Sequence, residues 1–409
     1  MVFVVFPNQC FDERHFRGRD KIIICDDPIF YGDRRGSEYG VQQLKLNPLR
    51  IEYQRACVRD LSARISATIV GNSRDLLKTE PGTITAFDPC DKLLEKRWRA
   101  LGIKYTFIDS PQFLATREDI ANFPIKTGAS GRPRLMHRTW YDYMKKKLGI
   151  LANTPNMDIY NRKAIPEAEQ GIEEPGALPT NPRGARAWFA KFLRERFARF
   201  GPYEDAIVHG RQYLYHSGIA PFLNNGLLTP AEVIEGALKV SSAVGIESLE
   251  GFLRQIIGWR EYSRLYYIRV PAAMARPSRS GRRPNKCWYT GRGLPTIVQE
   301  TIADAFKYGY LHHIRRLMVM SNYMTLSGLH ADAIYAWMFE FSLDSWEWVM
   351  VFNVYSMGTY ADRGIAMRKP YLSTTQYINR ISDAATRKMI RDDPKSKEWD
   401  DLYRAFMKK

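Results

Sequence analysis

The chain has 409 residues, more than one ordinary hydrophobic core accommodates, so we expect two or three domains. It carries 61 Lys and Arg against 44 Asp and Glu, and this formal net charge of +17 predicts an anionic polymer as partner. The five cysteines show no CxxC pair and no zinc-like spacing, and no apolar run reaches the ~20 residues that cross a bilayer. Composition therefore argues against disulfide-stabilised, zinc-binding and membrane-spanning proteins, and we expect an intracellular protein, cytoplasmic or associated with the nucleoid.

Residues 1–125 alternate short β-branched runs with helical segments. The predicted strands are Val2 to Phe6, Lys21 to Cys25, Ile65 to Val70, Thr83 to Phe87 and Lys104 to Ile108, and the predicted helices are Gln42 to Ser62 and Lys92 to Leu101. Continuous apolar strands separated by helices are typical of a parallel sheet covered on both faces, so we predict a Rossmann-like α/β domain. The segment contains neither GxGxxG nor a Walker sequence, and thus no standard phosphate-binding loop.

Residues 126–182 are rich in Gly, Pro, Asn and charge, as is typical of a long connection over the surface. They include aromatic and basic residues that suit contact with nucleic acid, namely Trp140, Tyr141, Tyr143, Lys145, Lys146 and Lys147. A solvated linker helix explains the same residues, so both interpretations stay open.

Residues 183–409 predict a mostly α-helical domain. Apolar residues recur at three- and four-residue spacing in Ala185 to Phe197, Thr229 to Val244, Ser248 to Tyr267, Thr296 to Ser327, Ala331 to Phe341 and the tail from Ser396. One basic loop, Ala275 to Gly293, interrupts these helices. Its arginines lie close to Trp288 and Tyr289, which suits phosphate contact and base stacking, although a solvated loop is the alternative.

The stretch from Gly309 to Tyr371 concentrates chemically active side chains among apolar neighbours. It contains His312, His313, Arg315, Arg316, Trp337, Asp344, Trp346, Glu347 and Trp348. That mixture suits a buried site for a flat, redox-active ligand.

Several separate blocks resemble the photolyase and cryptochrome superfamily, above all its prokaryotic (6-4) photolyase branch, whose members carry an iron–sulfur cluster. The blocks are Phe6 to Gln9, Leu148 to Leu151, Asn161 to Lys163, His216 to Leu228, Phe252 to Glu261, the stretch from Gly309 to Tyr371, and Tyr377 to Arg380. The resemblance runs nearly end to end. It implies an α/β domain at 1–125, a linker at 126–182, and a helical FAD-binding and DNA-binding domain at 183–409.

The resemblance also implies a function. Relatives bind FAD in a folded shape, and some hold an antenna pigment in the N-terminal domain. Light drives an electron from reduced flavin to a pyrimidine photoproduct that is flipped out of DNA. UV-damaged DNA is thus the implied partner, and the protein is expected to act as a monomer. The basic composition and the aromatic residues fit this expectation.

Roles follow position by position from the resemblance. The expected cofactor contacts are His216, Ser217, Gln255, Trp259, Arg316, Asp344 and Met350. Arg316 and Asp344 match the ion pair beside the isoalloxazine ring, where a buried cation favours the anionic reduced flavin. Capping, packing and an ordinary ion pair would explain these residues without the resemblance.

On the lesion side, the resemblance assigns His313, Leu317, Met357 and Tyr371. His313 matches a histidine that is proposed to donate a proton to the photoproduct, and Leu317 follows on the same helical face. His312 is expected to be structural. The predicted DNA contacts are Arg276, Arg279, Arg282, Arg283 and Lys286 of the basic loop.

Trp337, Trp288 and Tyr289 fall at or beside the electron-relay positions of the family. Met338 stands where relatives have a relay tyrosine, and Tyr289 stands where they have a tryptophan. Photoreduction through Trp346 or Trp348 is therefore an open alternative.

Two departures from the family bear on cofactors. The positions that match the cluster cysteines are Ile297, Ala385, Lys388 and Lys397, so we expect no iron–sulfur cluster, no other metal, and C-terminal helices held by Trp399, Leu402 and Phe406. Met350 stands where relatives place an acidic or amide group facing flavin N5. A thioether cannot hold a proton there, so a neutral flavin radical should be poorly stabilised.

Two classes of function therefore compete. The first is a cluster-free, FAD-dependent DNA photolyase for (6-4) photoproducts, with cyclobutane dimers as the other possible lesion. The second is a flavoprotein without repair activity, either a cryptochrome-like blue-light sensor or a DNA-binding relic. The lesion-side residues favour repair, whereas the lost cluster cysteines and Met350 are the case against it.

Overall fold

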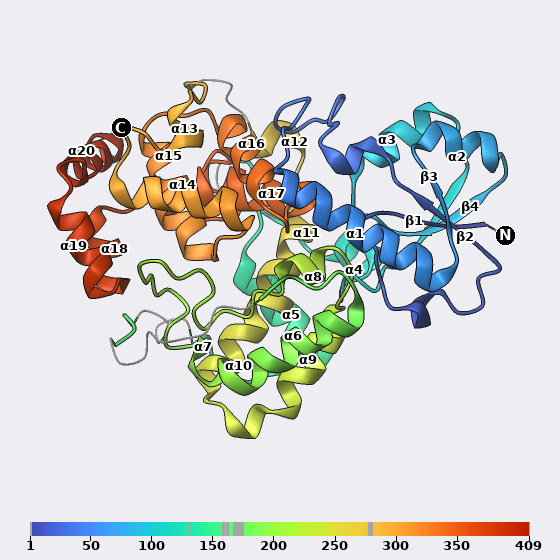
Figure 1. Ribbon diagram of the computed structural model, residues 1–409, viewed down its shortest axis with the longest axis horizontal. Helices are drawn as coiled ribbons and strands as arrows, with labels where there is room; N and C mark the ends of the chain where they lie inside the picture. Colours follow the sequence, from blue (N-terminus) through green and yellow to red (C-terminus); the bar gives the residue numbers. More distant parts are fainter. Residues whose placement is uncertain are drawn as a thin grey trace.

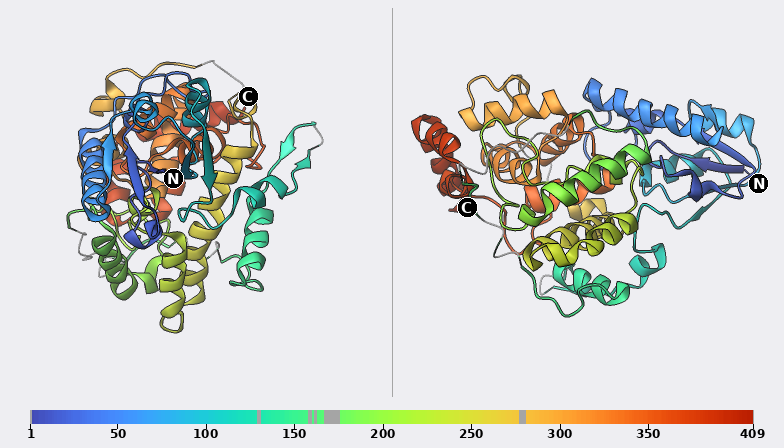
Figure 2. Two further views of the ribbon diagram at one scale, coloured as in Figure 1. Left: turned by 90° about the vertical axis from the view of Figure 1, so that its right-hand side faces the viewer. Right: turned by 60° about the horizontal axis from the view of Figure 1, so that its bottom comes forward.

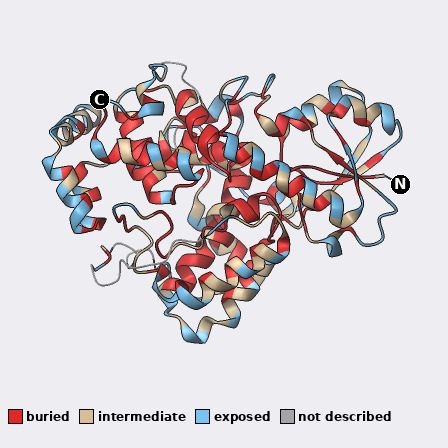
Figure 3. Ribbon diagram, in the orientation of Figure 1, coloured by how far each residue is buried: buried red, intermediate tan, exposed pale blue. Residues whose placement is uncertain are grey.

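The computed structural model describes residues 2–128, 131–157, 160, 163–166, 176–276 and 281–408. A sheet-containing part and a larger helical part lie side by side along the long axis of the molecule (Figure 1). Buried residues run continuously from one part into the other (Figure 3). The two parts therefore share one extended apolar core.

The N-terminal part contains a five-stranded, fully parallel sheet. Its strands are β1 (Val2–Val5), β2 (Lys21–Cys25), β3 (Thr68–Val70), β4 (Ile84–Phe87) and β5 (Tyr105–Ile108), in the order β3-β2-β1-β4-β5. In register, Val2 lies opposite Lys21 on one side and Ile84 on the other. The chain moves outward in opposite directions on the two sides of β1, which opens a crevice at the carboxyl ends of β1 and β4. The predicted parallel sheet is confirmed.

The helices of this part are α1 (Pro48–Ile65), α2 (Ser73–Thr79), α3 (Lys92–Ala100) and α4 (Arg117–Asn122), with the 3₁₀ turns η1 (Glu13–Phe16) and η2 (Pro28–Tyr31). The boundaries expected for the first helix were wrong. The side chain of Asn47 accepts a hydrogen bond from the backbone N–H of Leu49, and Pro48 fits the first turn, so α1 begins there. It continues through Ile65, which was expected to open a strand, and ends at Ser66 in the left-handed region (φ 49°).

The described residues of the linker up to Leu148 form regular secondary structure. A short antiparallel hairpin, β6 (Lys126–Thr127) and β7 (Pro133–Arg134), projects from the body (Figure 2) and is followed by α5 (His137–Leu148). Trp140, Tyr141 and Lys145 of α5 are buried, so both the solvated helix and the nucleic-acid contact were wrong for these three. Lys147 is near the carboxylate of Asp119 and forms an ion pair with it. The helix buries one face because α5 packs on the helical part.

The helical part follows the predicted apolar periodicity. Its α-helices are α6 (Pro182–Glu195), α7 (Phe197–Phe200), α8 (Ala220–Asn224), α9 (Pro230–Lys239), α10 (Ile246–Leu253), α11 (Glu261–Arg269), α12 (Ala272–Ala275), α13 (Cys287–Thr290), α14 (Thr296–Tyr308), α15 (Asn322–Leu326), α16 (Ala331–Phe341), α17 (Glu347–Met350), α18 (Thr375–Ile381), α19 (Ala384–Asp392) and α20 (Lys395–Met407); a 3₁₀ turn, η5 (Ser241–Ala243), follows α9. The continuous helix expected from Thr296 to Ser327 was wrong. Gly309 ends α14 at φ 61°, and a Cβ at this glycine would lie 2.8 Å from Leu343.

Three π-helical segments interrupt the helices: η6 (Arg254–Arg260), η7 (Arg315–Ser321) and η8 (Val351–Gly358). Such segments are rare and concentrate at functional sites, because each widened turn re-aims the side chains around it. All three fall in blocks that carry the sequence resemblance.

The C-terminal helices α18, α19 and α20 lie at one edge of the helical part (Figure 1). Trp399 of α20 is fully buried, its ring lies 4.9 Å from that of Tyr323, and its Nε1 donates to the Ser373 carbonyl at 3.2 Å. Leu402 and Phe406 pack partly buried against the same core, so the expected inward packing is confirmed. Of the positions matched to cluster cysteines, Ile297 lies in the core, and the others, Ala385, Lys388 and Lys397, are exposed.

Across the described ranges, no group of His, Cys, Asp and Glu is arranged to hold a metal ion. None of the helices in those same ranges is long and apolar enough to span a membrane.

Buried ion pairs join the sheet to the helical part. Arg34 pairs with Asp91 at 2.8 Å and with Glu347 of α17 at 2.6 Å. Asp88, after β4, pairs with Arg117 at 2.7 Å and with Arg264 of α11 at 2.8 Å. Each of these carboxylates is buried, and a lost partner would leave an uncompensated charge, so the two parts are held in one relative position.

We expect Trp399→Ala to lower the free energy of unfolding by about 3–5 kcal/mol, because a large buried ring is replaced by a cavity. Urea denaturation followed by circular dichroism measures the change. Met407→Ala, on the same helix but 57% exposed, is the control and should be nearly neutral. Equal effects of the two substitutions would contradict the packing role of Trp399.

Acid should destabilise the protein through Asp88. Burial alone would raise the pKa of Asp88, but hydrogen bonds and charges from Arg117 and Arg264 outweigh it and lower the pKa to about 2. A depressed folded-state pKa contributes stability above the unfolded value, about 3.9, that is lost as the pH falls towards 2, here about 2 kcal/mol. Thermal melts between pH 7 and pH 2 should show this loss, and Asp88→Asn should flatten it. Asp401→Asn, at an exposed carboxylate, is the matched control.

Candidate functional site

The candidate site lies where η7 and η8 pack together in the helical part. Arg316 of η7 forms two parallel hydrogen bonds with the carboxylate of Asp344, at 2.8 and 3.0 Å. Its Nε donates to the Leu311 carbonyl at 2.7 Å, and Asn224 of α8 donates to the Asp344 carbonyl at 2.8 Å. Burial would raise the pKa of Asp344, but Arg316 and the Ser342 hydroxyl lower it. The pair is therefore a fixed, ionised group inside the protein.

Two histidines stack beside this pair. The rings of His216 and His312 are 4.7 Å apart and nearly parallel, at 16°. Burial lowers the pKa of His216 to about 4, and burial with the neighbouring cations lowers that of His312 well below its usual range. Both rings are thus neutral at pH 7. The two ring nitrogens of His312 are buried without a hydrogen-bond partner, as expected for groups that await a ligand or a water molecule.

His313 opens the helix that leads into η7, and its side chain is exposed although the residues on both sides of it are buried. Nonetheless, burial and the nearby charge of Arg316 lower its pKa to about 4. The imidazole of His313 is therefore accessible, although it lies among buried residues and close to Arg316. Leu317 and Met357, its predicted neighbours on the lesion side, are buried in η7 and η8, whereas Tyr371 is 40% exposed.

The other predicted cofactor residues differ in their contacts and in their burial. His216 Nε2 lies 2.8 Å from the Glu204 carbonyl and Gln255 donates to the Glu204 carboxylate at 2.6 Å, so these two meet around one residue. The Ser217 carbonyl accepts from Trp188 at 2.8 Å, and Met350 is buried at the end of α17. His216, Ser217 and Gln255 all keep part of their surface open.

Trp259 is packed on both faces. His137 of α5 stacks on it at 3.6 Å and 10°, and Phe352 of η8 lies nearly parallel at 5.9 Å. Only the edge of this indole is therefore open to a ligand.

The residues present fit a flat flavin. A bidentate ion pair, the orphaned nitrogens of His312 and partly open polar side chains surround one region of otherwise buried helices. When bound there, FAD would supply light absorption and one-electron transfer.

The predicted relay residues form two branches. Trp337 is fully buried, and its Nε1 donates to the Trp288 carbonyl at 2.7 Å. The ring of Trp288 instead approaches Tyr323, at 5.8 Å. Tyr289 is 42% exposed, with its ring 5.9 Å from Phe306.

The basic loop is only partly available for DNA. Arg276 is engaged by Asp332, with Nε 2.9 Å from Oδ1, and by the Glu38 carbonyl at 2.9 Å. Arg282, Arg283 and Lys286 are exposed. Arg279 lies outside the described residues, as do Asn161 and Arg162 of the sequence blocks.

Sequence reasoning missed two features near the Arg316–Asp344 pair. Tyr213 and Tyr310 stack at 4.6 Å and 7°, and Tyr310 lies under the Arg316 guanidinium at 5.7 Å. Arg50 of α1 is buried, donates to the Phe339 carbonyl at 2.7 Å and lies 5.4 Å from the Trp346 ring. Neither stands in a motif, and only the fold brings them to the site.

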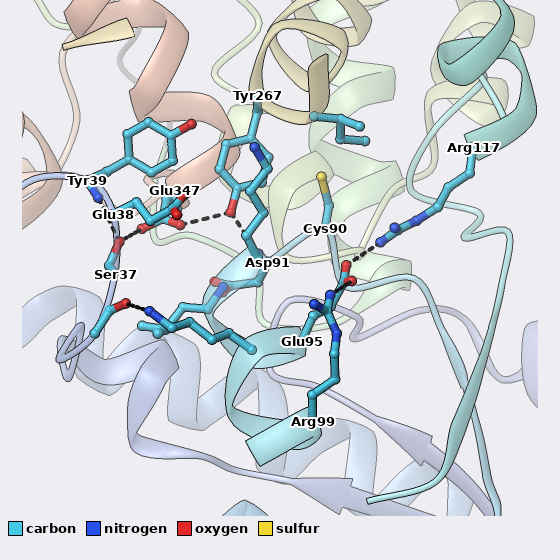
Figure 4. A pocket seen from close by; sticks show the side chains of 15 residues that line it. Ser37, Glu38, Tyr39, Cys90, Asp91, Glu95, Arg99, Arg117, Tyr267 and Glu347 are labelled. Carbon is cyan, nitrogen blue, oxygen red and sulfur yellow. Dashed lines mark hydrogen bonds and ion pairs between the residues drawn. The ribbon is translucent and has the colours of Figure 1, made fainter. Parts of the chain in front are cut away.

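A pocket between the two parts was also missed (Figure 4). This cavity of about 390 Å³ lies beyond the carboxyl end of β4, and is lined by residues of the loop before α1, by Cys90 and Asp91, by residues of α3 and α4, and by Tyr267, Ile268 and Glu347 of the helical part. Tyr267 and Ser37 both donate to the Glu347 carboxylate, at 2.8 and 2.7 Å. Burial lowers the pKa of Lys92, whose ammonium lies 4.9 Å from the Tyr267 ring.

Comparisons with known proteins agree with this geometry. The family described as deoxyribodipyrimidine photo-lyase-related protein matches residues 41–201. A (6-4) photolyase of Agrobacterium fabrum (strain C58 / ATCC 33970) is 27% identical over 93% of this chain and 83% of its own length. The uncharacterized protein R853 of Acanthamoeba polyphaga mimivirus is 38% identical over 26% of this chain and 85% of its own.

Two solved structures share the fold. The cryptochrome of Synechocystis sp. PCC6803 superposes with a TM-score of 0.64 at 13% identity, over 93% of this chain and 88% of that one. A bacterial class III photolyase from Agrobacterium tumefaciens superposes with a TM-score of 0.58 at 13% identity, over 100% and 98%. The family match and the (6-4) photolyase relative bear out the expected resemblance to the photolyase and cryptochrome superfamily, and the two solved structures show that the chain shares its fold.

Proposed function

We propose that the protein is an FAD-dependent photolyase that repairs (6-4) pyrimidine photoproducts in DNA. The observation that carries the proposal is the open imidazole of His313, which begins the helix that also holds Arg316 in its buried pair with Asp344. A proton-carrying side chain and a fixed charge beside a flavin-sized region are what light-driven repair of a flipped-out base requires. The name of the Agrobacterium relative supports the choice of lesion.

The residues would divide the work as follows. Arg316 would hold positive charge next to the reduced cofactor, because Asp344 fixes the guanidinium with two hydrogen bonds. His313 is neutral at pH 7 since its pKa is about 4, and negative charge arriving on the lesion would raise that pKa. The imidazole would then take a proton and deliver it to the photoproduct. Leu317 and Met357 would exclude water with their apolar side chains, and Tyr371 would contact the lesion from the exposed rim.

DNA would be held by charge. Arg282, Arg283 and Lys286 are exposed and suit phosphate contact, whereas Arg276 would mainly fix the loop through Asp332. Such contacts give affinity without sequence preference, which fits an enzyme whose target is a lesion.

The cavity between the sheet and the helical part would suit an antenna pigment. Aromatic rings of Tyr39 and Tyr267 and polar groups of Glu38, Lys92 and Glu347 line it. It lies beyond the carboxyl end of β4, and ligands of open parallel sheets bind outside the carboxyl ends of the strands.

A blue-light sensor without repair activity is the second candidate, since a solved cryptochrome shares this fold, but the buried Met350 counts against it. A thioether would disfavour a neutral flavin radical. That would hinder signalling through such a radical, whereas repair by fully reduced flavin could proceed.

The decisive experiment is light-dependent repair of an oligonucleotide with one defined (6-4) photoproduct by the pre-reduced, FAD-loaded protein. We expect repair by the unmodified chain and a loss of about a hundredfold or more in His313→Ala, the scale of a removed proton donor. High-performance liquid chromatography of the digested product measures it. A cyclobutane-dimer substrate and His330→Ala, a histidine that caps α16 instead, are the controls. If FAD-loaded, reduced protein repairs neither lesion, the proposed repair function is wrong and the blue-light sensor is the remaining candidate.

Recombinant protein should contain flavin without stoichiometric iron or sulfide, because Ile297, Ala385, Lys388 and Lys397 cannot supply thiolates. Elemental analysis by mass spectrometry, calibrated against bound FAD, measures this ratio. Stoichiometric iron with acid-labile sulfide would contradict the expectation and the alignment of the C-terminal helices.

A further inference from the structure

An unbroken line of aromatic rings leads from the Arg316–Asp344 pair to the protein surface. The Arg316 guanidinium lies 5.3 Å from the Phe341 ring, which lies 4.9 Å from Trp337. Trp337 lies 5.7 Å from Phe306, and Phe306 lies 5.9 Å from Tyr289. Tyr289 ends the line because its ring is 42% exposed. An electron can thus move between the site and the surface in short steps.

This line differs from the order expected from the sequence. Trp288 joins Trp337 only through its backbone carbonyl, and its ring approaches Tyr323, which in turn lies 4.9 Å from Trp399. Phe306 takes the bridging place. A phenylalanine has no readily oxidised group, so it conducts between Trp337 and Tyr289 without holding the charge.

Tyr289 has a buried carboxylate as its hydrogen-bond partner. Its hydroxyl donates to Glu340 Oε2 at 3.1 Å, while Glu340 Oε1 accepts from the Lys45 backbone N–H at 2.9 Å. The Glu340 carbonyl accepts from the Asn47 N–H at 2.8 Å, so the residue is held from both ends. One oxygen is thereby fixed on the phenol. Burial raises the pKa of Glu340, which makes its carboxylate a better base.

Oxidising a phenol releases a strongly acidic proton, and the electron leaves easily only if a base takes that proton. The resemblance already gives Tyr289 a relay role, and we propose that Glu340 is the base that accepts the phenol proton when Tyr289 is oxidised. The inference rests on the proposed FAD-dependent function and adds a residue to it.

The step balances in atoms and electrons. With FAD bound, the light-excited cofactor would take one electron from Trp337, and Tyr289 would then give one electron to Trp337 through Phe306. At the same moment the Oη–H bond of Tyr289 breaks and an H–Oε2 bond forms on Glu340. A neutral tyrosyl radical and a neutral carboxylic acid result. A thiol in solution returns an electron and a proton to Tyr289, and Glu340 releases its proton to water.

The test compares variants of the full chain. FAD-loaded protein is illuminated with dithiothreitol, flavin reduction is followed by absorbance, and the radical is recorded by electron paramagnetic resonance. Tyr289→Phe removes only the hydroxyl, and Glu340→Gln keeps the size of the side chain but not the base. Tyr308→Phe is the matched control, since Tyr308 is 39% exposed at the end of α14. A second arm oxidises flavin-free protein with a photogenerated ruthenium tris-bipyridine oxidant.

We expect the tyrosyl signal and fast photoreduction to be lost in Tyr289→Phe and unchanged in Tyr308→Phe. Glu340→Gln should slow radical formation about a hundredfold, the scale of a removed general base. In the flavin-free arm, Tyr289→Phe should remove part of the radical yield. Glu340→Gln should lower that same part of the yield.

Each contrary outcome overturns one part of the proposal. Unchanged photoreduction in Tyr289→Phe overturns Tyr289 as donor, and unchanged rates in Glu340→Gln, in both arms, overturn Glu340 as acceptor. Tyr289-dependent photoreduction in a protein that repairs no lesion overturns the proposed repair function alone. A chain that binds no FAD overturns the proposed function and the relay, and the ruthenium arm then decides the role of Glu340.

Discussion

The need to pair buried charge in the segment from Ser342 to Trp348 holds this structure together. Asp344 is fixed by Arg316, and Glu347 by Arg34 and Tyr267. Arg50, from the first helix of the chain, donates to the Ser345 carbonyl in the same segment. Removing any of these partners would leave a charge or a polar group without compensation in a region that excludes water. These contacts hold the segment in one conformation, and residues from both parts of the molecule pack against it.

The candidate site inherits its geometry from this constraint. Arg316 is held by Asp344, and the backbone of Asp344 is held in turn by Asn224. The π-helical turns of η7 and η8 then set which side chains reach inward and which stay open, and His313 is the open one. Burial and the charge of Arg196 lower the pKa of His216, and burial with the charges of Arg315 and Arg316 lowers that of His312, so both rings are neutral.

The same packing separates the routes by which charge could travel. Relatives place a tyrosine after the relay tryptophan; here Met338 stands there, and the fold offers Phe306 and Tyr289 instead. Trp346, the alternative considered from the sequence, leads through Phe30 at 5.8 Å towards the sheet. That path runs away from the nearest surface of the helical part. Tyr289 combines exposure with a fixed carboxylate, which is why it suits exchange with solvent.

The sequence by itself determined the parallel sheet, the helical second part and the blocks that meet at the site, because strand and helix periodicity and capping are local properties. Thr229 with Pro230 and Glu232 starts α9 in this way, and Trp399 is buried on the apolar face that the tail predicts. The predicted helix boundaries were wrong where contacts between distant residues decide where a helix ends. Gly309 ends α14 because Leu343 occupies the space that a side chain would need.

Only the tertiary structure decided what the motifs contact. It stacked His137 on Trp259, joined Gln255 to His216 through Glu204, and aimed Glu340 at Tyr289. In each of these contacts, one partner (His137, Glu204 or Tyr289) lies outside the sequence blocks that carry the resemblance. A side chain's neighbours across a core depend on how whole helices pack, which no local pattern encodes.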